Sequence, residues 1–355
     1  MNLKKTRINT ATPGLPKSRV MIIYTGGTFG MSYDDKGILI PFDFSLILEH
    51  LPTLRNLYLD LTVVSFENPV DSSNIDLSHW KMIADIIFES YNDHDGYVVL
   101  HGTDTMAYTA SALSFMLQGL GKPVILTGAQ LPIGEPRSDA RENLITSLEI
   151  ASNHNVPEVS IYFDYQLLRG NRSRKVESEH FDAFESGNYP FLATAGVKID
   201  YNISAIHSPP KTGEKLRIFK KFDTSVSILK LFPGMQPAVV QSVLDTPGLK
   251  ALVLETFGSG NGPTASWFIE MLRKAIDRGL LILNVSQCPG GMVMQGRYET
   301  SKMLQQIGVI GGVDMTTEAA LTKLMILIGE YGVEEAKKKV SVSIAGELTT
   351  PNPEP

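Results

Sequence analysis

Apolar runs that alternate with amphipathic stretches predict alternating strands and helices along most of this chain. In the first half, five apolar runs have the length and composition of buried strands: 20–23, 61–66, 96–100, 123–127 and 159–163. Helical stretches lie between them, at 77–91, 106–117 and 137–153. Strands joined by helices usually lie parallel. We therefore expect an α/β fold whose larger, N-terminal domain has a mostly parallel sheet flanked by helices.

The same alternation resumes after a break at residues 204–223, where prolines and charged residues replace the apolar runs. Its apolar and helical stretches are 227–232, 251–256, 265–278, 280–285 and 316–331. We predict a smaller C-terminal α/β domain from them. The predicted division is a disordered tail at 1–18, the N-terminal domain at 19–205, an interdomain linker at 206–224 and the C-terminal domain at 225–355.

Composition narrows the function classes. The chain has 355 residues, of which 43% are apolar and 20% charged, close to the average of soluble globular proteins. The formal net charge of -6 argues against a nucleic-acid partner, and no apolar run is long enough to span a membrane. The single cysteine, Cys288, argues against disulfides and cysteine metal sites. With no apolar signal segment at the start, we expect a cytoplasmic protein.

The first candidate motif is the loop that follows the strand at 20–23. It reads Thr25-Gly26-Gly27-Thr28. Ligands of open α/β sheets bind at the carboxyl ends of the strands, and glycines let the backbone approach a ligand closely. Thr28 would place a hydroxyl there. The alternative is a strand-ending turn with an incidental threonine.

The second candidate motif follows the strand at 96–100 and reads His101-Gly102-Thr103-Asp104-Thr105. It puts Thr103 and Asp104 at a strand end and a helix start, where backbone N–H groups favour anions. The alternative is that Asp104 caps the helix. Two strand ends with glycines and hydroxyls in one parallel sheet favour a ligand site over either alternative.

Two further polar segments are less specific. Asp71-Ser72-Ser73-Asn74 follows the strand at 61–66, and capping of the next helix is the default interpretation of such residues. The basic turn at 169–175 ends in Lys175. It is either a solvated loop or a segment that delivers a lysine to the site.

The residue inventory favours hydroxyl chemistry. The chain has no His-Glu-x-x-His pair and no P-loop, and its seven histidines are scattered, so we expect no metal and no cofactor. A threonine hydroxyl is a weak nucleophile that needs a base, commonly a lysine or a relay ending in a carboxylate. Two threonines, one aspartate and one lysine are therefore compatible with acyl transfer through a threonine ester.

The two motifs together resemble the paired motifs of bacterial L-asparaginases. The longer run His101 to Leu117, HGTDTMAYTASALSFML, is similar to the type I, cytoplasmic branch. The resemblance covers nearly the whole chain after about residue 19. It implies that the chain is a hydrolase that converts L-asparagine to L-aspartate and ammonia through a β-aspartyl ester, with weaker activity on glutamine.

The resemblance also assigns roles to residues. Thr28 would be the nucleophile, Thr103 would position water, Asp104 would hold the substrate α-amino group, and Lys175 would work with both. The substrate-binding set would be Asp71, Ser72 and Ser73 at the α-carboxylate, with Gly27 and Gly102 beside the nucleophile and the second motif. Similar enzymes form homodimers or homotetramers, and no nucleic acid or membrane partner is implied.

Three departures from the family pattern matter. Many relatives carry a tyrosine after the lid glycine, whereas here Gly37 is followed by Ile38. Tyr33 is the only tyrosine in that loop, so we assign it the lid role. Some type I enzymes have an allosteric asparagine site with an arginine and a cysteine. Cys288 matches the cysteine, but Glu255 stands at the arginine position and Arg174 replaces an expected threonine. An anion should repel an amino-acid carboxylate, so we expect no asparagine allostery.

Two rival functions share the fold. An amidase subunit of a transfer-RNA amidotransferase would make ammonia for a partner, but it usually carries an additional N-terminal domain. An amino-acid sensor would keep the pocket without turnover, but it would not need a nucleophile. Release of ammonia from asparagine separates the enzyme from the sensor.

Overall fold

The computed structural model describes residues 3–33, 39–41, 47–296 and 299–350. The chain forms two compact units, one of residues 1–186 and 190–218 and the other of residues 187–189 and 219–355. Each unit has its own sheet, so the predicted pair of α/β domains is confirmed. In the part of the chain that is described, no helix combines the length and the hydropathy needed to cross a membrane.

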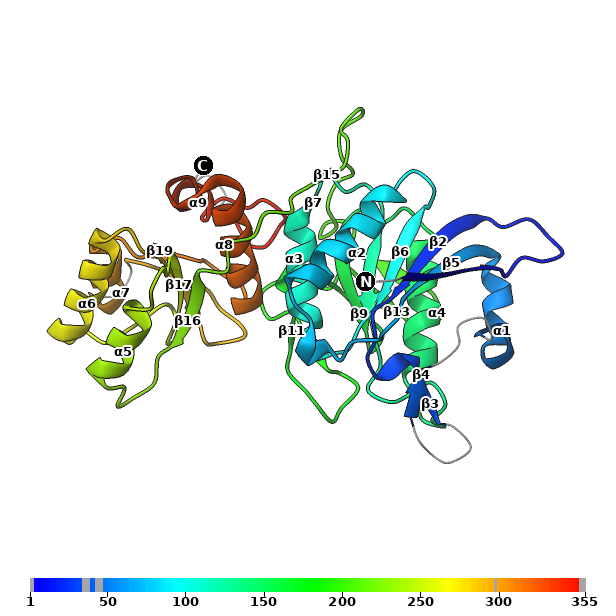
Figure 1. Ribbon diagram of the computed structural model, residues 1–355, viewed down its shortest axis with the longest axis horizontal. Helices are drawn as coiled ribbons and strands as arrows, with labels where there is room; N and C mark the ends of the chain where they lie inside the picture. Colours follow the sequence, from blue (N-terminus) through cyan, green and yellow to red (C-terminus); the bar gives the residue numbers. More distant parts are fainter. Residues whose placement is uncertain (1–2, 34–38, 42–46, 297–298, 351–355) are drawn as a thin grey trace. The chain divides into compact units, whose positions relative to one another are not determined.

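The first unit is built on a nine-stranded sheet in the order β1-β5-β2-β6-β8-β9-β10-β13-β14 (Figure 1). Its five central strands run parallel: β5 (Leu59–Phe66), β2 (Ser18–Tyr24), β6 (Gly96–Leu100), β8 (Val124–Thr127) and β9 (Val159–Phe163). These are the five predicted strands. They are almost entirely buried because helices cover both faces of the sheet.

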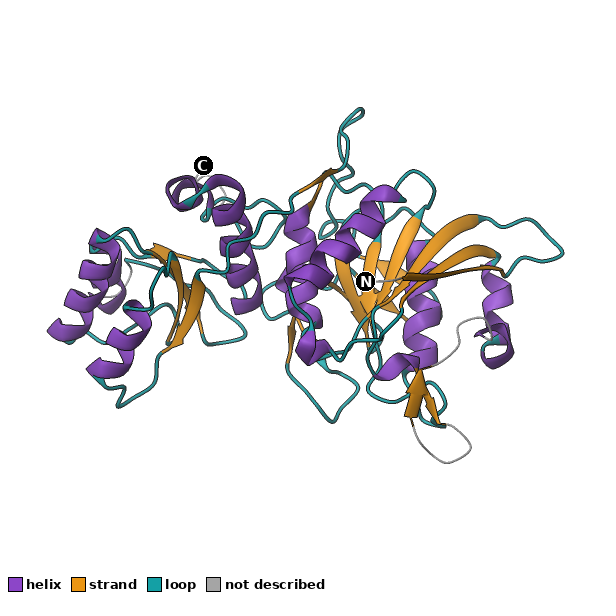
Figure 2. Ribbon diagram, viewed as in Figure 1, coloured by secondary structure: helices purple, strands orange, loops and turns teal. Residues whose placement is uncertain are grey.

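Two neighbouring residues of β6 show which helix covers which face. Tyr97 donates its hydroxyl to the Ile87 carbonyl of α2 (Leu77–Glu89). A Cβ on Gly96 would lie 2.0 Å from the Ala151 carbonyl oxygen of α4 (Ala140–Ala151). Successive residues of a strand face opposite ways, so α2 and α4 lie on opposite faces. Helix α3 (Met106–Met116) packs beside α2 (Figure 2). Trp80 of α2 donates its ring N–H to the Thr109 hydroxyl of α3 at 2.9 Å.

Antiparallel strands complete both edges of this sheet. β1 (Leu3–Asn9) pairs along its whole length with β5, and β10 (Gln166–Arg169), β13 (Ala193–Ala195) and β14 (Ile199–Tyr201) extend the opposite edge. The disordered tail predicted at 1–18 is therefore wrong for residues 3–9. The strand is held by a salt bridge from Arg7 to the buried Asp60 carboxylate, besides its backbone hydrogen bonds.

Apart from 3₁₀ turns, the other described helices and strands of the first unit are short. They are β3 (Met31–Tyr33) paired with β4 (Leu39–Pro41), helix α1 (Ile47–His50), β7 (Leu117–Gln118) paired with β15 (Arg217–Ile218), and β11 (Arg174–Lys175) paired with β12 (Phe184–Glu185). Strand β15 lies within the segment 206–224, which we predicted to be an interdomain linker. Its pairing with β7 makes it part of the first unit.

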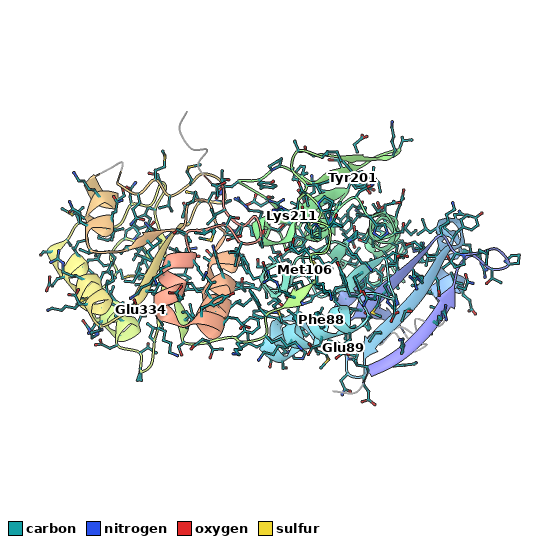
Figure 3. The ribbon with its side chains drawn as sticks, turned by 90° about the horizontal axis from the view of Figure 1, so that it is seen from above. Phe88, Glu89, Met106, Tyr201, Lys211 and Glu334 are labelled. Atoms are coloured by element: carbon teal, nitrogen blue, oxygen red, sulfur yellow. The ribbon has the colours of Figure 1, made fainter. Side chains whose placement is uncertain are left out.

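The second unit has a four-stranded parallel sheet in the order β16 (Val226–Lys230), β17 (Ala251–Thr256), β18 (Leu281–Ser286) and β19 (Ile310–Gly311). One apolar cluster packs the sheet against α5 (Pro237–Leu244), α6 (Ser266–Asp277) and α7 (Glu299–Gln306). A second cluster packs it against α8 (Thr317–Tyr331) and α9 (Val333–Lys339), whose Glu334 is labelled in Figure 3.

A buried ion pair fixes the segment after α9 to α8. Lys323 lies 2.5 Å from the Glu347 carboxylate, and both side chains are fully buried. The Lys323 ammonium also donates to the carbonyls of Val340 and Val342. Burial lowers the pKa of Lys323, and the nearby Glu347 carboxylate opposes this shift. The pair is compatible with burial because both charges are hydrogen-bonded on several sides.

Candidate active site

The two predicted motifs lie side by side because their strands are neighbours. Tyr24 ends β2 opposite Leu100, which ends β6. Thr25 then donates both its backbone N–H and its hydroxyl to the Leu100 carbonyl, each at 3.0 Å. The loops that follow are therefore held against each other at the carboxyl edge of the sheet, where α/β proteins bind ligands.

Glycines bring the two loops into direct contact. Gly27 has φ +84°, and a Cβ there would lie 2.6 Å from the Cα of Gly102. A Cβ on Gly102 would in turn lie 2.7 Å from the Ser72 hydroxyl oxygen. Three segments that are far apart in the sequence thus meet at Gly27, Gly102 and Ser72. Side chains at the two glycines would push the segments apart, which explains the glycines at both positions.

Thr28 follows this contact directly and begins the short 3₁₀ helix Thr28–Gly30. It is exposed, whereas the next residue, Phe29, is fully buried and anchors the turn. Thr28 is one residue beyond Gly27, and Thr103 is one residue beyond Gly102. The two threonines therefore follow the two glycines that touch, as expected for residues of one site.

Lys175 joins the second motif. Its ammonium donates to the Thr103 hydroxyl oxygen at 2.8 Å and to the Asp104 carboxylate at 2.7 Å. The Lys175 side chain is 17% exposed and that of Asp104 is 65% exposed. The buried lysine stem fixes the ammonium, while the carboxylate keeps access to solvent and to a ligand. Lys175 is thus hydrogen-bonded to both Thr103 and Asp104, so the solvated-loop interpretation is wrong for residue 175.

The lysine is delivered by a hairpin that starts from a buried turn. Lys175 lies in β11, which pairs with β12, and the 3₁₀ turn Gly170–Arg172 precedes it. A Cβ on Gly170 would lie 3.0 Å from the Ala110 side chain of α3. The turn is therefore packed on the same helix that follows Thr103 and Asp104, which places the lysine above them.

The polar cluster at 71–74 lies beside the second motif. Ser72 is buried, and its carbonyl accepts a hydrogen bond from the Thr105 hydroxyl at 2.6 Å. Asp71 caps the short 3₁₀ helix Ser72–Asn74 by accepting from Ser73, and hydrogen bonds from the Ser73 hydroxyl and backbone lower the Asp71 pKa. The following helix α2 is capped by Asp76 instead. The default interpretation, that this cluster caps the helix predicted at 77–91, is therefore wrong: Asp71 caps only the short 3₁₀ helix.

His101 supports the second motif from below. Its Nδ1 lies 2.7 Å from the Gly102 carbonyl, which can only accept, so Nδ1 carries the proton. Its Nε2 then accepts from the Thr109 hydroxyl at 2.9 Å, and Thr109 accepts from Trp80 at 2.9 Å. This network satisfies the neutral imidazole, and burial lowers the pKa of His101 to about 4. A neutral His101 therefore holds the carbonyl next to Thr103.

Tyr33, Glu255 and Cys288 are further residues that the sequence singles out. The backbone of Tyr33 ends β3, but its side chain lies outside the described residues, as does the loop at 34–38. Glu255 of β17 is buried and accepts from the Thr317 hydroxyl at 2.5 Å, with the Lys230 ammonium 3.9 Å away. Cys288 is exposed. Within the described ranges, no group of three or more histidine, cysteine and acidic residues could hold a metal ion.

One residue of this region was missed in the sequence. Gln130 accepts a hydrogen bond from Thr103 at 3.3 Å and donates to two carbonyls of the β11–β12 loop. Its only sequence signal is its place after Gly128, which follows the end of a third parallel strand, β8. A lone glutamine in a loop carries no motif, so this signal is visible only beside the other two strand ends.

The chain is similar to known proteins along most of its length. A family model described as "Asparaginase, N-terminal" matches residues 19–207, and one described as "Glutaminase/Asparaginase C-terminal domain" matches residues 225–340. L-asparaginase 1 of Escherichia coli strain K12 is 41% identical over 344 residues, which cover 94% of this chain and 99% of the relative. The human 60 kDa lysophospholipase is 40% identical over 365 residues, which cover 96% of this chain and 63% of the relative.

Solved structures agree with these matches. The crystal structure of L-asparaginase I from Vibrio cholerae has a TM-score of 0.86 to this chain at 38% sequence identity. The match covers 94% of this chain and 99% of that structure. The similarity thus extends over both units and is not limited to the two motifs.

Proposed function

This chain belongs to the asparaginase family, and we propose that it hydrolyses L-asparagine to L-aspartate and ammonia with Thr28 as nucleophile. The family membership confirms the resemblance to type I L-asparaginases that the two motifs predict. The observation that carries the proposal is the Lys175 ammonium shared by Thr103 and Asp104, beside the loop of Thr28. A binding protein would need the charges but not a second, exposed hydroxyl at the contact of the two loops.

The first half-reaction forms the ester. The Thr28 oxygen attacks the side-chain amide carbon of asparagine, the C–N bond breaks, and the Thr28 proton ends on the leaving nitrogen, which departs as ammonia. Charge develops on the amide oxygen in the transition state. Backbone N–H groups of the loops beside Thr28 and Thr103 are suited to stabilise it.

The second half-reaction restores the enzyme. Water adds its hydroxyl to the acyl carbon of the β-aspartyl ester and returns its proton to Thr28, which releases aspartate. Thr103 is suited to position this water, because its oxygen is already fixed by the Lys175 ammonium at 2.8 Å. A hydroxyl that is already held in one orientation loses no further rotational freedom of its own when it binds and orients the attacking water.

Substrate recognition follows from charge. The Asp104 carboxylate, 65% exposed, attracts the α-amino group of asparagine. Ser72 lies next to Gly102, and Ser72 with Asp71 and Ser73 is the set we propose at the α-carboxylate end. Glutamine is longer by one methylene, which is typically worth about 1–3 kcal/mol of discrimination. We therefore propose a weaker glutaminase activity, with Tyr33 as the lid residue.

We also propose that asparagine does not regulate this enzyme from the C-terminal unit. The buried Glu255 carboxylate already accepts from Thr317 and faces Lys230, so it offers a negative charge where an amino-acid carboxylate would need a positive one. A hyperbolic dependence of rate on asparagine concentration is expected. A strongly sigmoidal curve for the purified protein would contradict this part.

The cytoplasmic location and a homodimer or homotetramer are parts of the proposal that rest on the resemblance to type I enzymes. Analytical ultracentrifugation of the purified protein tests the assembly. A species with the mass of one 39.0 kDa chain at assay concentration would reject it.

The experiment that tests the function combines an ammonia assay with mass spectrometry after a rapid acid quench with asparagine. Wild type should release ammonia and carry a transient aspartyl adduct on Thr28, and folded Thr28→Ala should do neither. Near-full activity of Thr28→Ala would move the nucleophile to Thr103. Saturable asparagine binding by wild type without ammonia release would reject the enzyme in favour of a sensor.

A further inference from the structure

We propose that Gln130 is a positioning residue of this site, whose side-chain amide holds the Thr103 hydroxyl and the Lys175 hairpin in their reactive arrangement. The proposal rests on the proposed function, because it concerns the same reaction. Three observations carry it: the anchored backbone of Gln130, the two bonds from its amide nitrogen and the one bond to its amide oxygen.

The backbone at Gln130 is fixed by Asp139, which precedes α4. The N–H groups of Gln130 and Leu131 donate to the Asp139 carboxylate at 3.0 and 3.1 Å. Asn143 donates to the same carboxylate at 3.2 Å and to the Gly128 carbonyl at 3.0 Å. The loop after β8 is thus tied to the start of α4 from two sides. The Gln130 side chain therefore projects from a rigid support.

The amide nitrogen of Gln130 is hydrogen-bonded to the hairpin that carries Lys175. It donates to the carbonyls of Ser178 at 3.2 Å and His180 at 2.9 Å. Both lie in the loop between β11 and β12, whose side chains are mostly exposed. These two bonds add to the short β11–β12 pair and to the backbone bonds from Val176 and Glu177 to the Ala183 carbonyl.

The same two bonds determine the orientation of the amide. Carbonyl oxygens can only accept, so the NH₂ group must face Ser178 and His180, and the amide oxygen must face Thr103. Thr103 then donates its only proton to Gln130. The hydrogen-bond chain runs from the Lys175 ammonium to the Thr103 oxygen and from the Thr103 hydroxyl to Gln130.

This polarity has a consequence for the chemistry. Because the Thr103 proton is committed to Gln130, the Thr103 oxygen can offer a ligand only an accepting lone pair. A water or hydroxyl beside it must therefore donate, which points its own oxygen lone pairs away from Thr103 and toward an acyl carbon. Gln130 thus sets the direction of this hydrogen-bond chain, and it acts on the reaction through Thr103 and the Lys175 hairpin.

The test is Gln130→Met, which keeps the length of the side chain but can neither donate to the hairpin nor accept from Thr103. We expect kcat for asparagine to fall about 10- to 100-fold, the cost typical of slightly misplaced reacting groups. KM should change less than about threefold, because the proposed anchors of the substrate charges, Asp104 and Ser72, are not bonded to Gln130. If Gln130→Met unfolds below the assay temperature, Gln130→Ala takes its place with the same expectation.

Gln118→Met is the matched control. Gln118 also donates its amide nitrogen to two carbonyls, of Ser114 at 3.3 Å and Phe115 at 3.0 Å. It lies beyond the far end of α3, about 16 Å along the helix axis from the end that carries Thr103. The Gln118→Met variant should lower the melting temperature about as much as Gln130→Met does, while its kcat stays within about twofold of wild type.

The outcomes separate this proposal from the proposed function. If wild type releases ammonia and Gln130→Met keeps its kcat, the positioning role is wrong and the function stands. The same holds if Gln118→Met lowers kcat as much as Gln130→Met. If wild type releases no ammonia from asparagine, the proposed function fails and the positioning role falls with it.

Discussion

Lys175 and Thr103 are 72 residues apart in the sequence, yet the lysine ammonium lies 2.8 Å from the threonine hydroxyl oxygen. The sheet brings one partner to the end of β6, and the turn packed on α3 brings the other. The pair therefore forms only when the sheet and the turn at 170–172 have both packed in place. Lys175 is the first residue we would substitute.

Lys175→Met should keep the buried stem of the side chain and remove the charge. We expect kcat/KM for asparagine to fall about 10²- to 10⁴-fold, the range of a residue that assists proton transfer. Lys198→Met is the control, because Lys198 is exposed in the β13–β14 hairpin. The measurement is the rate of ammonia release from both variants. Equal activities of Lys175→Met and Lys198→Met would show that Lys175 takes no part in the reaction.

Gly27→Ala should abolish the contact of the two motif loops. The new Cβ would meet Gly102 at 2.6 Å, and φ is +84°. Gly234→Ala is a matched control for the backbone strain alone, because Gly234 has φ +87° with no atom within 4 Å of a Cβ.

The two glycine variants should differ sharply. Strain costs roughly 1–2 kcal/mol in both, by analogy with left-handed residues elsewhere. Only Gly27→Ala should also lose at least about 100-fold in kcat/KM, since it displaces the loop of Thr28, the proposed nucleophile. Thermal unfolding and ammonia assays of both variants test this, and an active Gly27→Ala would show that the loops need not touch.

The buried His101 predicts a pH dependence of stability. Its pKa is about 4 in the folded protein against an ordinary 6.5, so between these values the unfolded chain binds a proton that the folded protein does not. The free energy of unfolding should therefore fall by about 3 kcal/mol as the pH drops from 6.5 to 4. Urea unfolding across this range should show a steeper loss for wild type than for His101→Asn. Parallel profiles would mean that His101 does not stay neutral.

Lys323→Met should destabilise the second unit strongly. The substitution leaves the fully buried Glu347 carboxylate without its cation, which typically costs about 3–5 kcal/mol. Lys337→Met, which breaks the Lys337–Glu334 pair on the surface of α9, should cost less than about 1 kcal/mol. Denaturant unfolding of the two variants gives the comparison, and similar losses would mean that the buried pair contributes no more than a surface pair.

The central strands and the two motifs were predictable because their signals are local. A run such as 96–100 is fully buried on both faces and therefore apolar throughout, and the glycine turn after it marks the strand end. Thr103 and Asp104 follow that turn directly. Patterns of this kind need no knowledge of the partner strand.

The edge strand β1 and Gln130 were not predictable for the opposite reason. β1 buries only Ile8 and is stabilised by pairing with β5, more than fifty residues away, so its own sequence reads as a polar tail. Gln130 acquires its role from Thr103 and from the Lys175 hairpin, 27 and about 50 residues away. A polar residue whose partners are distant has no periodicity to reveal it.

The position of β1 also bears on the colloidal behaviour of this protein. It covers β5, a largely apolar strand, and presents Lys4 and Lys5 at the new edge of the sheet, where charged side chains discourage pairing between molecules. A protein shortened to begin at residue 19, where the family model begins, would keep every residue of the proposed site but expose the edge of β5. Such a protein should lose activity on storage through aggregation, even when freshly purified material is fully active.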